Sequence, residues 1–177
     1  FEELLNRGSL SADDCVMVQI AVPSRESVDD YAELRAYVER LSGRINGRFG
    51  RPGRAAVHYL YRSLPFEELA AYYRMADVMV VTPLRDGMNL VAKEYVAANE
   101  GDIGTIVLSE FAGAAHELKA GALLVNPHDI DGLAATMEMA LTLDDKEQRR
   151  RMGLLRQAVR KNTVFGWAES FLEALAS

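Results

Sequence analysis

The chain has 177 residues, of which 49% are hydrophobic and 26% are charged, a composition typical of a globular protein with a buried core. It carries 20 Lys and Arg residues against 26 Asp and Glu residues. The resulting net charge of −6 argues against general binding to nucleic acid or anionic membranes. The single cysteine, Cys15, excludes an internal disulfide, and no apolar run approaches the ~20 residues of a membrane-spanning helix. These features fit a cytoplasmic protein.

Apolar runs and helix-like stretches alternate along the chain, which starts in helix-like sequence at Phe1. Five short runs, apolar on both faces and rich in β-branched residues, predict buried parallel strands at residues 16–22, 57–61, 78–81, 105–108 and 122–125. Helices are predicted between and after these strands, at residues 27–49, 65–75, 89–99, 111–119, 129–143, 145–161 and 163–175.

This alternation predicts an α/β fold, a doubly wound parallel sheet with helices on both faces, in three Rossmann-like α/β/α layers. In such a sheet, ligands bind beyond the carboxyl ends of the strands. The loops expected to carry function are therefore residues 23–27, 62–65, 82–89, 109–113 and 126–129.

One segment, residues 81–95 with the sequence VTPLRDGMNLVAKEY, runs from a strand through a tight loop into a helix. Pro83 ends the strand, Asp86 and Gly87 form a turn pair, and Asn89 is a favourable N-cap. The amides of residues 87–91 are expected to point outward with the positive end of the helix dipole. Such an arrangement is typical of a site for phosphate or another anion.

Two carboxylates flank these amides. Asp86 precedes the helix, and Glu94 lies one turn after Leu90 on the same helix face. A carboxylate accepts hydrogen bonds from two vicinal hydroxyls, as on a ribose or a hexose, so the arrangement suits a sugar nucleotide. The alternative is structural, with Asp86 in an Asx turn and Glu94 as a solvated helix residue, since strand–loop–helix turns are common.

The run TPLRDGMNLVAKEY, residues 82–95, resembles the signature of the trehalose-6-phosphate synthase family, retaining glycosyltransferases of the two-domain GT-B type. The resemblance covers nearly the whole chain and implies that residues 1–177 are the C-terminal, donor-binding domain. It also implies that the N-terminal acceptor domain is absent, that the family's diphosphate-binding Arg and Lys lie on a segment just before Phe1 and are missing too, and that the helix at residues 163–177 crosses towards the absent domain. Matching segments occur in the same order at residues 20–25, 43–47, 80–98, 109–115 and 124–127.

The resemblance implies roles for the residues of the loop and of the helix that follows. Asp86 matches the acid that contacts the transferred glucose, and it is the expected catalytic residue. Gly87, Met88 and Asn89 match the backbone around the hydroxyls of that glucose. Glu94 matches the acid that holds the ribose of the nucleotide.

The resemblance also implies contacts with the diphosphate, the base and the acceptor. Leu90 and Val91 match residues whose amides meet the diphosphate. Arg25 matches an arginine that reaches the phosphate of glucose 6-phosphate. Leu64 stands where the family has a residue whose backbone meets the base. A Phe is usual at that position, so the choice among UDP, GDP and ADP stays open.

The implied activity is transfer of glucose from a nucleotide diphosphate sugar, UDP-glucose first among them, to glucose 6-phosphate, which gives trehalose 6-phosphate. No cofactor, metal, nucleic acid or membrane is expected, and homo-oligomerisation stays open. The 177 residues alone, without the acceptor domain, are expected to be inactive. Two alternatives remain: a sister synthase such as glucosylglycerol-phosphate synthase, and a non-catalytic regulator that binds sugar nucleotides.

Other signals have simpler interpretations. His58, His116 and His128 have no partner at metal-ligand spacing. The small residues at 109–115 either allow close packing of a helix on the sheet or form a wall of the donor pocket. The acidic and then basic run at residues 144–151 is typical of helix electrostatics.

Overall fold

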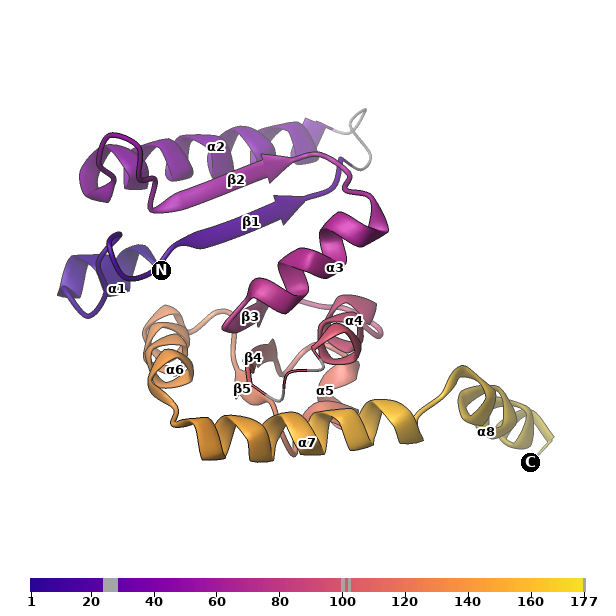
Figure 1. Ribbon diagram of the computed structural model, residues 1–177. Coiled ribbons are helices and arrows are strands. Elements are labelled where there is room, and N and C mark those ends of the chain that lie inside the picture. Colours follow the sequence, from indigo (N-terminus) through magenta and orange to yellow (C-terminus); the bar gives the residue numbers. More distant parts are fainter. Residues whose placement is uncertain (24–28, 100, 102, 177) are drawn as a thin grey trace. The chain divides into compact units, whose positions relative to one another are not determined.

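The computed structural model describes residues 1–23, 29–99, 101 and 103–176, and the chain divides into two compact units (Figure 1). These are the N-terminal unit, Phe1–Phe66, and the C-terminal unit, Glu67–Ser177. Within the part of the chain that the structure describes, each helix is too short or too polar to cross a membrane.

The N-terminal unit contains a two-stranded parallel ladder. Strand β1 (Met17–Ala21) pairs with β2 (Val57–Tyr61), in register from residues 17 and 57 to residues 21 and 61. Helix α1 (Glu2–Arg7) precedes β1, and the long helix α2 (Asp29–Phe49) connects the two strands. The parallel pairing follows from this helical connection, because a short turn could join only antiparallel neighbours.

Polar contacts attach α2 to the rest of the N-terminal unit. The Asn46 side chain donates to the carbonyl oxygen of Val57 and accepts from its N–H, both at 2.8 Å. Arg44 and Arg48 of α2 form ion pairs with Glu2 of α1 at 2.6 and 3.2 Å. The apolar core beneath them consists of Leu5, Ile45, Ala56 and Val57.

The C-terminal unit contains a three-stranded parallel ladder in the order β3–β4–β5. These strands are β3 (Val78–Val81), β4 (Thr105–Ser109) and β5 (Leu123–Val125). All five residues of the central strand, β4, are buried. The five predicted strands therefore all form and pair in parallel, as one ladder of two strands and one of three. The prediction that all are buried is wrong for β1 and for most of β2, whose residues are partly exposed.

Six helices follow the order that the sequence predicts, although α5 is shorter than expected. Residues 109–113 form a turn in which the Ser109 side chain accepts from the Phe111 N–H and its carbonyl oxygen accepts from the Ala112 N–H, both at 3.1 Å. The helices are α3 (Phe66–Met75), α4 (Leu90–Ala98), α5 (Ala114–Leu118), α6 (Ile130–Thr142), α7 (Asp145–Lys161) and α8 (Val164–Ala176).

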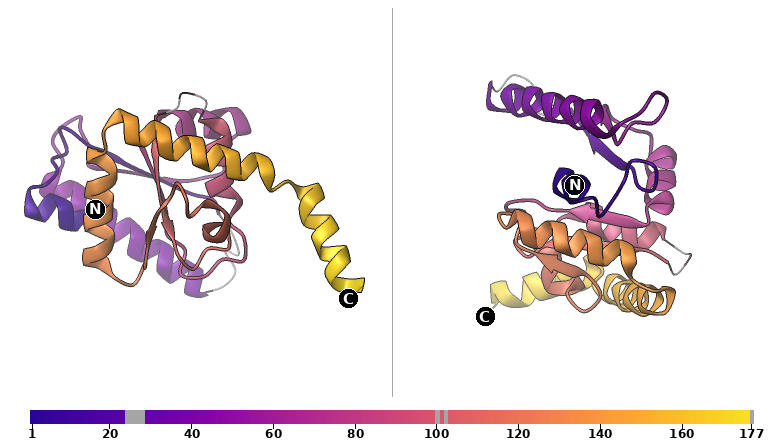
Figure 2. Two further views of the ribbon diagram at one scale, coloured as in Figure 1. Left: turned by 90° about the horizontal axis from the view of Figure 1, so that it is seen from below. Right: turned by 90° about the vertical axis from the view of Figure 1, so that its left-hand side faces the viewer.

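The central strand sends its side chains alternately into two cores. Ile106 and Leu108 lie in the larger core with residues of α3, α4, α5 and α7, whereas Val107 lies in the smaller core with residues of α6. Helix α7 runs alongside the layer of α4 and α5 (Figures 1 and 2). The C-terminal unit is thus an α/β/α sandwich, the three-layer arrangement that the sequence predicts for the chain as a whole.

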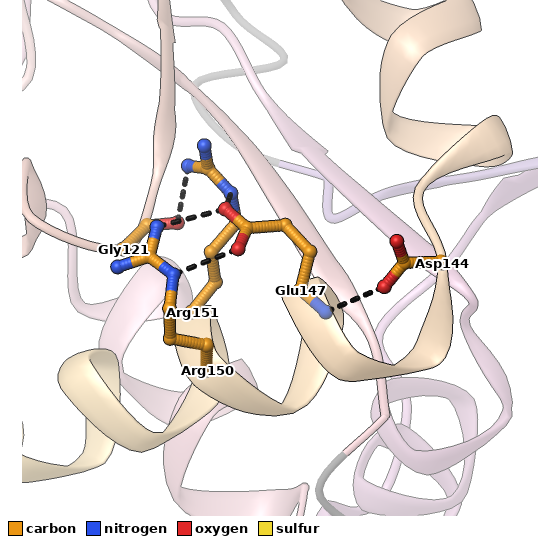
Figure 3. A network of polar contacts seen from close by, with 5 residues as sticks. All are labelled: Gly121, Asp144, Glu147, Arg150 and Arg151. Carbon is orange, nitrogen blue, oxygen red and sulfur yellow. Dashed lines mark hydrogen bonds and ion pairs between the residues drawn. The ribbon is translucent and has the colours of Figure 1, made fainter.

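Glu147 organises the start of α7 (Figure 3). The Asp144 side chain accepts from the Glu147 N–H at 2.8 Å, which makes Asp144 the N-cap. The Glu147 carboxylate accepts two hydrogen bonds from Arg150 at 2.7 Å each, and its oxygen lies 2.8 Å from Nε of Arg151. Arg151 also donates to the carbonyl oxygen of Gly121 at 3.3 Å, so this network fastens α7 to the turn before β5.

The last helix, α8, exposes a set of apolar side chains. Phe165 is 81% exposed, and Trp167 stacks on Phe171 with ring centroids 5.4 Å apart. The exposed apolar residues of α8 are Val164, Phe165, Trp167, Phe171, Leu172 and Leu175.

Candidate functional site

The loop between β3 and α4 ends on a residue with unusual backbone geometry. Asn89 has φ 75° and ψ 84°, in the left-handed region, and it is the one non-glycine residue with positive φ in the described part of the chain. Its side chain accepts from the Ala92 N–H at 3.0 Å, which confirms Asn89 as the N-cap. Such strain persists only where neighbouring contacts hold it, and it is enriched at ligand-binding sites.

Asp86 shapes this loop and holds Asn89. One carboxylate oxygen of Asp86 accepts from the Met88 N–H at 3.1 Å, and the other accepts from the Asn89 side-chain amide at 3.0 Å. The Asx turn considered from the sequence therefore forms. It leaves binding capacity, because each carboxylate oxygen has a further lone pair. Asp86 is half-buried, with its position fixed at both oxygens.

The first turn of α4 offers backbone donors. Gly87, Met88, Leu90 and Val91 are all exposed. The N–H groups of Leu90 and Val91 belong to the first helical turn, where no carbonyl lies one turn earlier to accept them. The expectation that all amides from Gly87 to Val91 point outward is wrong for Met88, whose N–H is donated to Asp86. The donors suited to an anion are therefore those at the helix start.

Glu94 lies one turn further along α4, where its side chain is exposed. Its Oε2 accepts a hydrogen bond from the hydroxyl of Tyr73 on α3 at 3.0 Å. Two effects raise the pKa of Tyr73 above its ordinary value: burial, which is the larger, and this bond to Glu94. The phenol therefore remains a donor. Glu94 is thus more than a solvated helix residue, because one of its oxygens is held in place.

The turn between β4 and α5 is bonded directly to the loop. The Asp86 N–H donates to the Phe111 carbonyl oxygen at 3.3 Å, and the Gly113 N–H donates to the Asp86 carbonyl oxygen at 2.9 Å. The Ala114 N–H donates to the Met88 carbonyl oxygen at 2.6 Å. These three backbone bonds hold residues 86–88 against the turn that follows β4.

Two further contacts hold the same pair of segments. A Cβ atom on Gly113 would overlap the carbonyl oxygen of Gly87, so only glycine permits this approach. The Lys93 ammonium donates to both oxygens of Glu117 at 2.8 and 2.9 Å and so connects α4 to α5. Of the two interpretations of residues 109–115, the structure supports close packing. These residues pack against the candidate binding loop between β3 and α4.

The structure does not test two predicted site residues against this arrangement. Leu64 lies in the loop after β2, in the N-terminal unit, and is half-buried. Arg25 lies outside the described residues. The structure therefore brings together the residues from Asp86 to Val91 and Glu94. Within the described ranges, it assembles no group of three or more His, Cys, Asp and Glu side chains that could hold a metal ion.

The sequence interpretation missed Tyr73 and did not single out Gly113. Tyr73 occupies one apolar position in a helical pattern, and its partner, Glu94, lies 21 residues away. Gly113 was noticed only as one of several small residues. No local pattern carries either contact, because both depend on how separate elements pack.

The α/β fold and the loop between β3 and α4 are shared with a known protein family. The model of glycosyltransferase family 20 matches residues 1–177, and the chain belongs to this family. At the level of individual proteins, it is similar to trehalose-6-phosphate synthases. The protein of Mycobacterium avium is 56% identical over 99% of this chain, and that of Mycobacterium tuberculosis is 53% identical over the same share. The chain spans only 36% and 35% of these two relatives.

Solved structures give the same result. An α,α-trehalose-phosphate synthase (UDP-forming) from Burkholderia xenovorans, in complex with glucose-6-phosphate, is 42% identical with a TM-score of 0.93. The match covers 99% of this chain and 39% of that one. An Escherichia coli protein bound with UDP-2-fluoro glucose is 42% identical with a TM-score of 0.92, over 98% of this chain and 39% of the other. The predicted fold class is thereby confirmed.

Proposed function

We propose that this chain is the donor-binding part of a retaining glucosyltransferase that transfers glucose from UDP-glucose to glucose 6-phosphate and forms trehalose 6-phosphate. The observation that carries the proposal is the pair of carboxylates, Asp86 and Glu94, on either side of the amide end of α4. The names and ligands of the similar proteins support it. They favour trehalose 6-phosphate as product over that of a sister synthase.

In this proposal the loop and helix bind the donor in three parts. The hexose lies against Asp86 and the backbone of Gly87, Met88 and Asn89. The first amides of α4, at residues 90–91, receive the diphosphate, and Glu94 accepts hydrogen bonds from the ribose diol. These amides also stabilise the negative charge that builds on the leaving diphosphate, because they are oriented before the reaction starts.

The remaining roles concern the base, the acceptor and the rest of the protein. The backbone of Leu64 meets the base, and Arg25 binds the phosphate of glucose 6-phosphate. A segment just before Phe1 supplies an Arg and a Lys for the diphosphate. An N-terminal domain outside these 177 residues supplies the acceptor site, and the helix at residues 163–177 crosses towards it. The exposed apolar side chains of α8 support this last point, since a large apolar surface is a typical contact surface.

A binding measurement tests the donor assignment. The chain is titrated with UDP, GDP and ADP by calorimetry, and UDP is expected to bind tightest. The matched control is the Glu138→Ala variant, which removes a carboxylate from α6, on the opposite face of the sheet from α4. This variant should bind UDP as the unchanged chain does. A chain that is folded by circular dichroism but binds none of the three nucleotides would contradict the proposal.

A further inference from the structure

We propose that Tyr73 is a positioning residue for the nucleotide: its hydroxyl holds Glu94 in the rotamer that accepts the ribose diol. This inference rests on the proposed donor site, in which Glu94 binds the ribose. It adds a residue from a different helix, α3, that touches no part of the substrate. The observation behind it is the 3.0 Å hydrogen bond from the Tyr73 hydroxyl to Oε2 of Glu94.

The two side chains differ in the freedom that their surroundings leave them. Tyr73 is only 6% exposed and lies in the larger core, so its ring is fixed by packing. Glu94 is exposed on α4, where an unbound glutamate would sample several rotamers in water. The hydrogen bond to the packed Tyr73 therefore restricts the rotamers of an otherwise flexible carboxylate. Oε1 of Glu94, and one lone pair of Oε2, remain for a ligand.

The direction of this bond also suits a diol. Tyr73 donates to Oε2 and occupies one acceptor position of Glu94, and the remaining lone pairs of the carboxylate can accept from the two hydroxyls of a ribose. Ligand affinity rises when the binding group is already held in its bound geometry, because less conformational entropy is lost on binding. Tyr73 thus acts on the ribose through Glu94 alone, which separates it from a residue that merely stabilises the fold.

The experiment compares nucleotides with and without the ribose diol. The probes are whichever of UDP, GDP and ADP binds tightest and the 2′,3′-dideoxy form of the same nucleotide. Tyr73→Phe keeps the ring and deletes only the hydroxyl. We expect it to weaken binding of the ribonucleotide about three- to tenfold, the effect of one lost hydrogen bond. Binding of the dideoxy form should stay within about twofold.

A second measurement tests whether Tyr73 works through Glu94. In the Glu94→Ala background, adding Tyr73→Phe should change the affinity for the ribonucleotide by less than about twofold, because the hydroxyl has lost its partner. The matched control is Tyr95→Phe. It removes another buried hydroxyl, whose acceptor is the Ala76 carbonyl oxygen at 3.4 Å, and should leave the ratio of the two affinities unchanged.

Several outcomes would overturn the inference. One is an equal loss for both nucleotides in Tyr73→Phe, and another is no loss for either. A Tyr73→Phe protein that fails to fold would show a purely structural hydroxyl. If the unchanged chain binds nucleotide but does not distinguish ribose from dideoxyribose, the role of Glu94 fails and Tyr73 fails with it. If the unchanged chain binds the ribonucleotide more tightly than the dideoxy form, and Tyr73→Phe alters neither affinity, the proposed function stands and this inference alone is wrong.

Discussion

At the scale of single residues, the charged and amide side chains of the candidate site are each held by at least one hydrogen bond. Asn89 uses its carbonyl oxygen to cap α4 and its amide to hold Asp86. Asp86 in turn accepts from the Met88 N–H. Such mutual bonding reduces the motion of the carboxylate, so a ligand would meet a group that is already in place.

The first prediction concerns Glu94. Glu94→Ala should weaken binding of the nucleoside diphosphate by ~1.5–3 kcal/mol, because hydrogen bonds from the ribose to a charged acceptor are lost. The fold should persist, since the side chain is exposed. Calorimetry measures the affinity and thermal unfolding checks the fold. An affinity equal to that of the unchanged chain would rule out Glu94 as the ribose acceptor.

The second prediction separates Asp86 from Glu94. Asp86→Ala should weaken binding of the nucleotide sugar and leave binding of the free nucleoside diphosphate nearly intact, because Asp86 is assigned to the hexose. In the protein together with its acceptor domain, turnover should fall on the order of 100-fold from misplacement of the reacting sugar. Equal losses for nucleotide and nucleotide sugar would place Asp86 elsewhere, or show that its contacts with Met88 and Asn89 support the whole loop.

At the scale of elements, the structure joins two strand-end loops into one unit. The loop after β3 and the turn after β4 share three backbone hydrogen bonds and the close approach of Gly113 to Gly87. Lys93 and Glu117 then connect the helices that follow, α4 and α5. The candidate binding loop is therefore supported by a neighbouring element from Asp86 to Met88.

The third prediction tests this support. Gly113→Ala places a methyl group where the Gly87 carbonyl oxygen lies, so it should destabilise the chain by about 1–3 kcal/mol through overpacking. It should also weaken nucleotide-sugar binding, since the loop must shift. The control is Gly153→Ala on α7, where a Cβ has nothing within 4 Å. That change should stabilise the helix by about 0.5–1 kcal/mol.

Urea unfolding measures the free energy of unfolding of both glycine variants, and calorimetry measures their affinity for the nucleotide sugar. A Gly113→Ala chain as stable as the unchanged one, with full affinity, would show that the two loops move apart at no cost. The contact would then have no role in holding the site.

The fourth prediction concerns the ion pairs at the start of α7. The hydrogen bonds from Arg150, with the charge of Arg151, lower the pKa of Glu147 from 4.5 to about 2. A carboxylate with a lowered pKa in the folded state adds stability above pH 4.5, and this stability is lost as the pH falls towards 2. Glu147→Gln should therefore be less stable than the unchanged chain at neutral pH and equally stable near pH 2.

Thermal unfolding across this pH range, at low and high salt, measures the difference. The effect should be small and should shrink with salt, because the ions are solvent-accessible. Glu138→Gln on α6 serves as control, because it makes the same substitution at a residue outside the network of Figure 3. A difference that persists unchanged near pH 2 would show that Glu147 acts through packing and not through its charge.

At the scale of the whole molecule, the chain matches its family over its full length yet spans about 36% of the relatives. The fifth prediction follows from this proportion. The 177 residues alone should bind the nucleotide and form no trehalose 6-phosphate at any concentration of glucose 6-phosphate. Catalysis needs both substrates held in one geometry, and the proposed acceptor site lies outside these residues. Nucleotide binding in the same sample confirms a folded chain, and detection of the product would contradict the prediction.

Local patterns in the sequence were sufficient for the fold class and for the local backbone geometry of the candidate site. The strands of the C-terminal unit are apolar on both faces because helices cover them on both sides, so the α/β class could be predicted from the order of the runs. The N-cap at Asn89 and the turn at Asp86 could also be predicted, because each is a contact within three residues. The resemblance to a family then added a hypothesis about the substrate, which these local patterns do not contain.

Only the tertiary structure decided which distant groups support the site. The Tyr73–Glu94 bond, the Gly113–Gly87 approach and the Lys93–Glu117 pair all join different elements, and no spacing in the sequence encodes them. The shortened α5 has a similar cause, because residues 109–113 turn to bond the neighbouring loop. Local pattern reports the preferences of a segment, whereas these contacts depend on where packing of the core places each segment against the next.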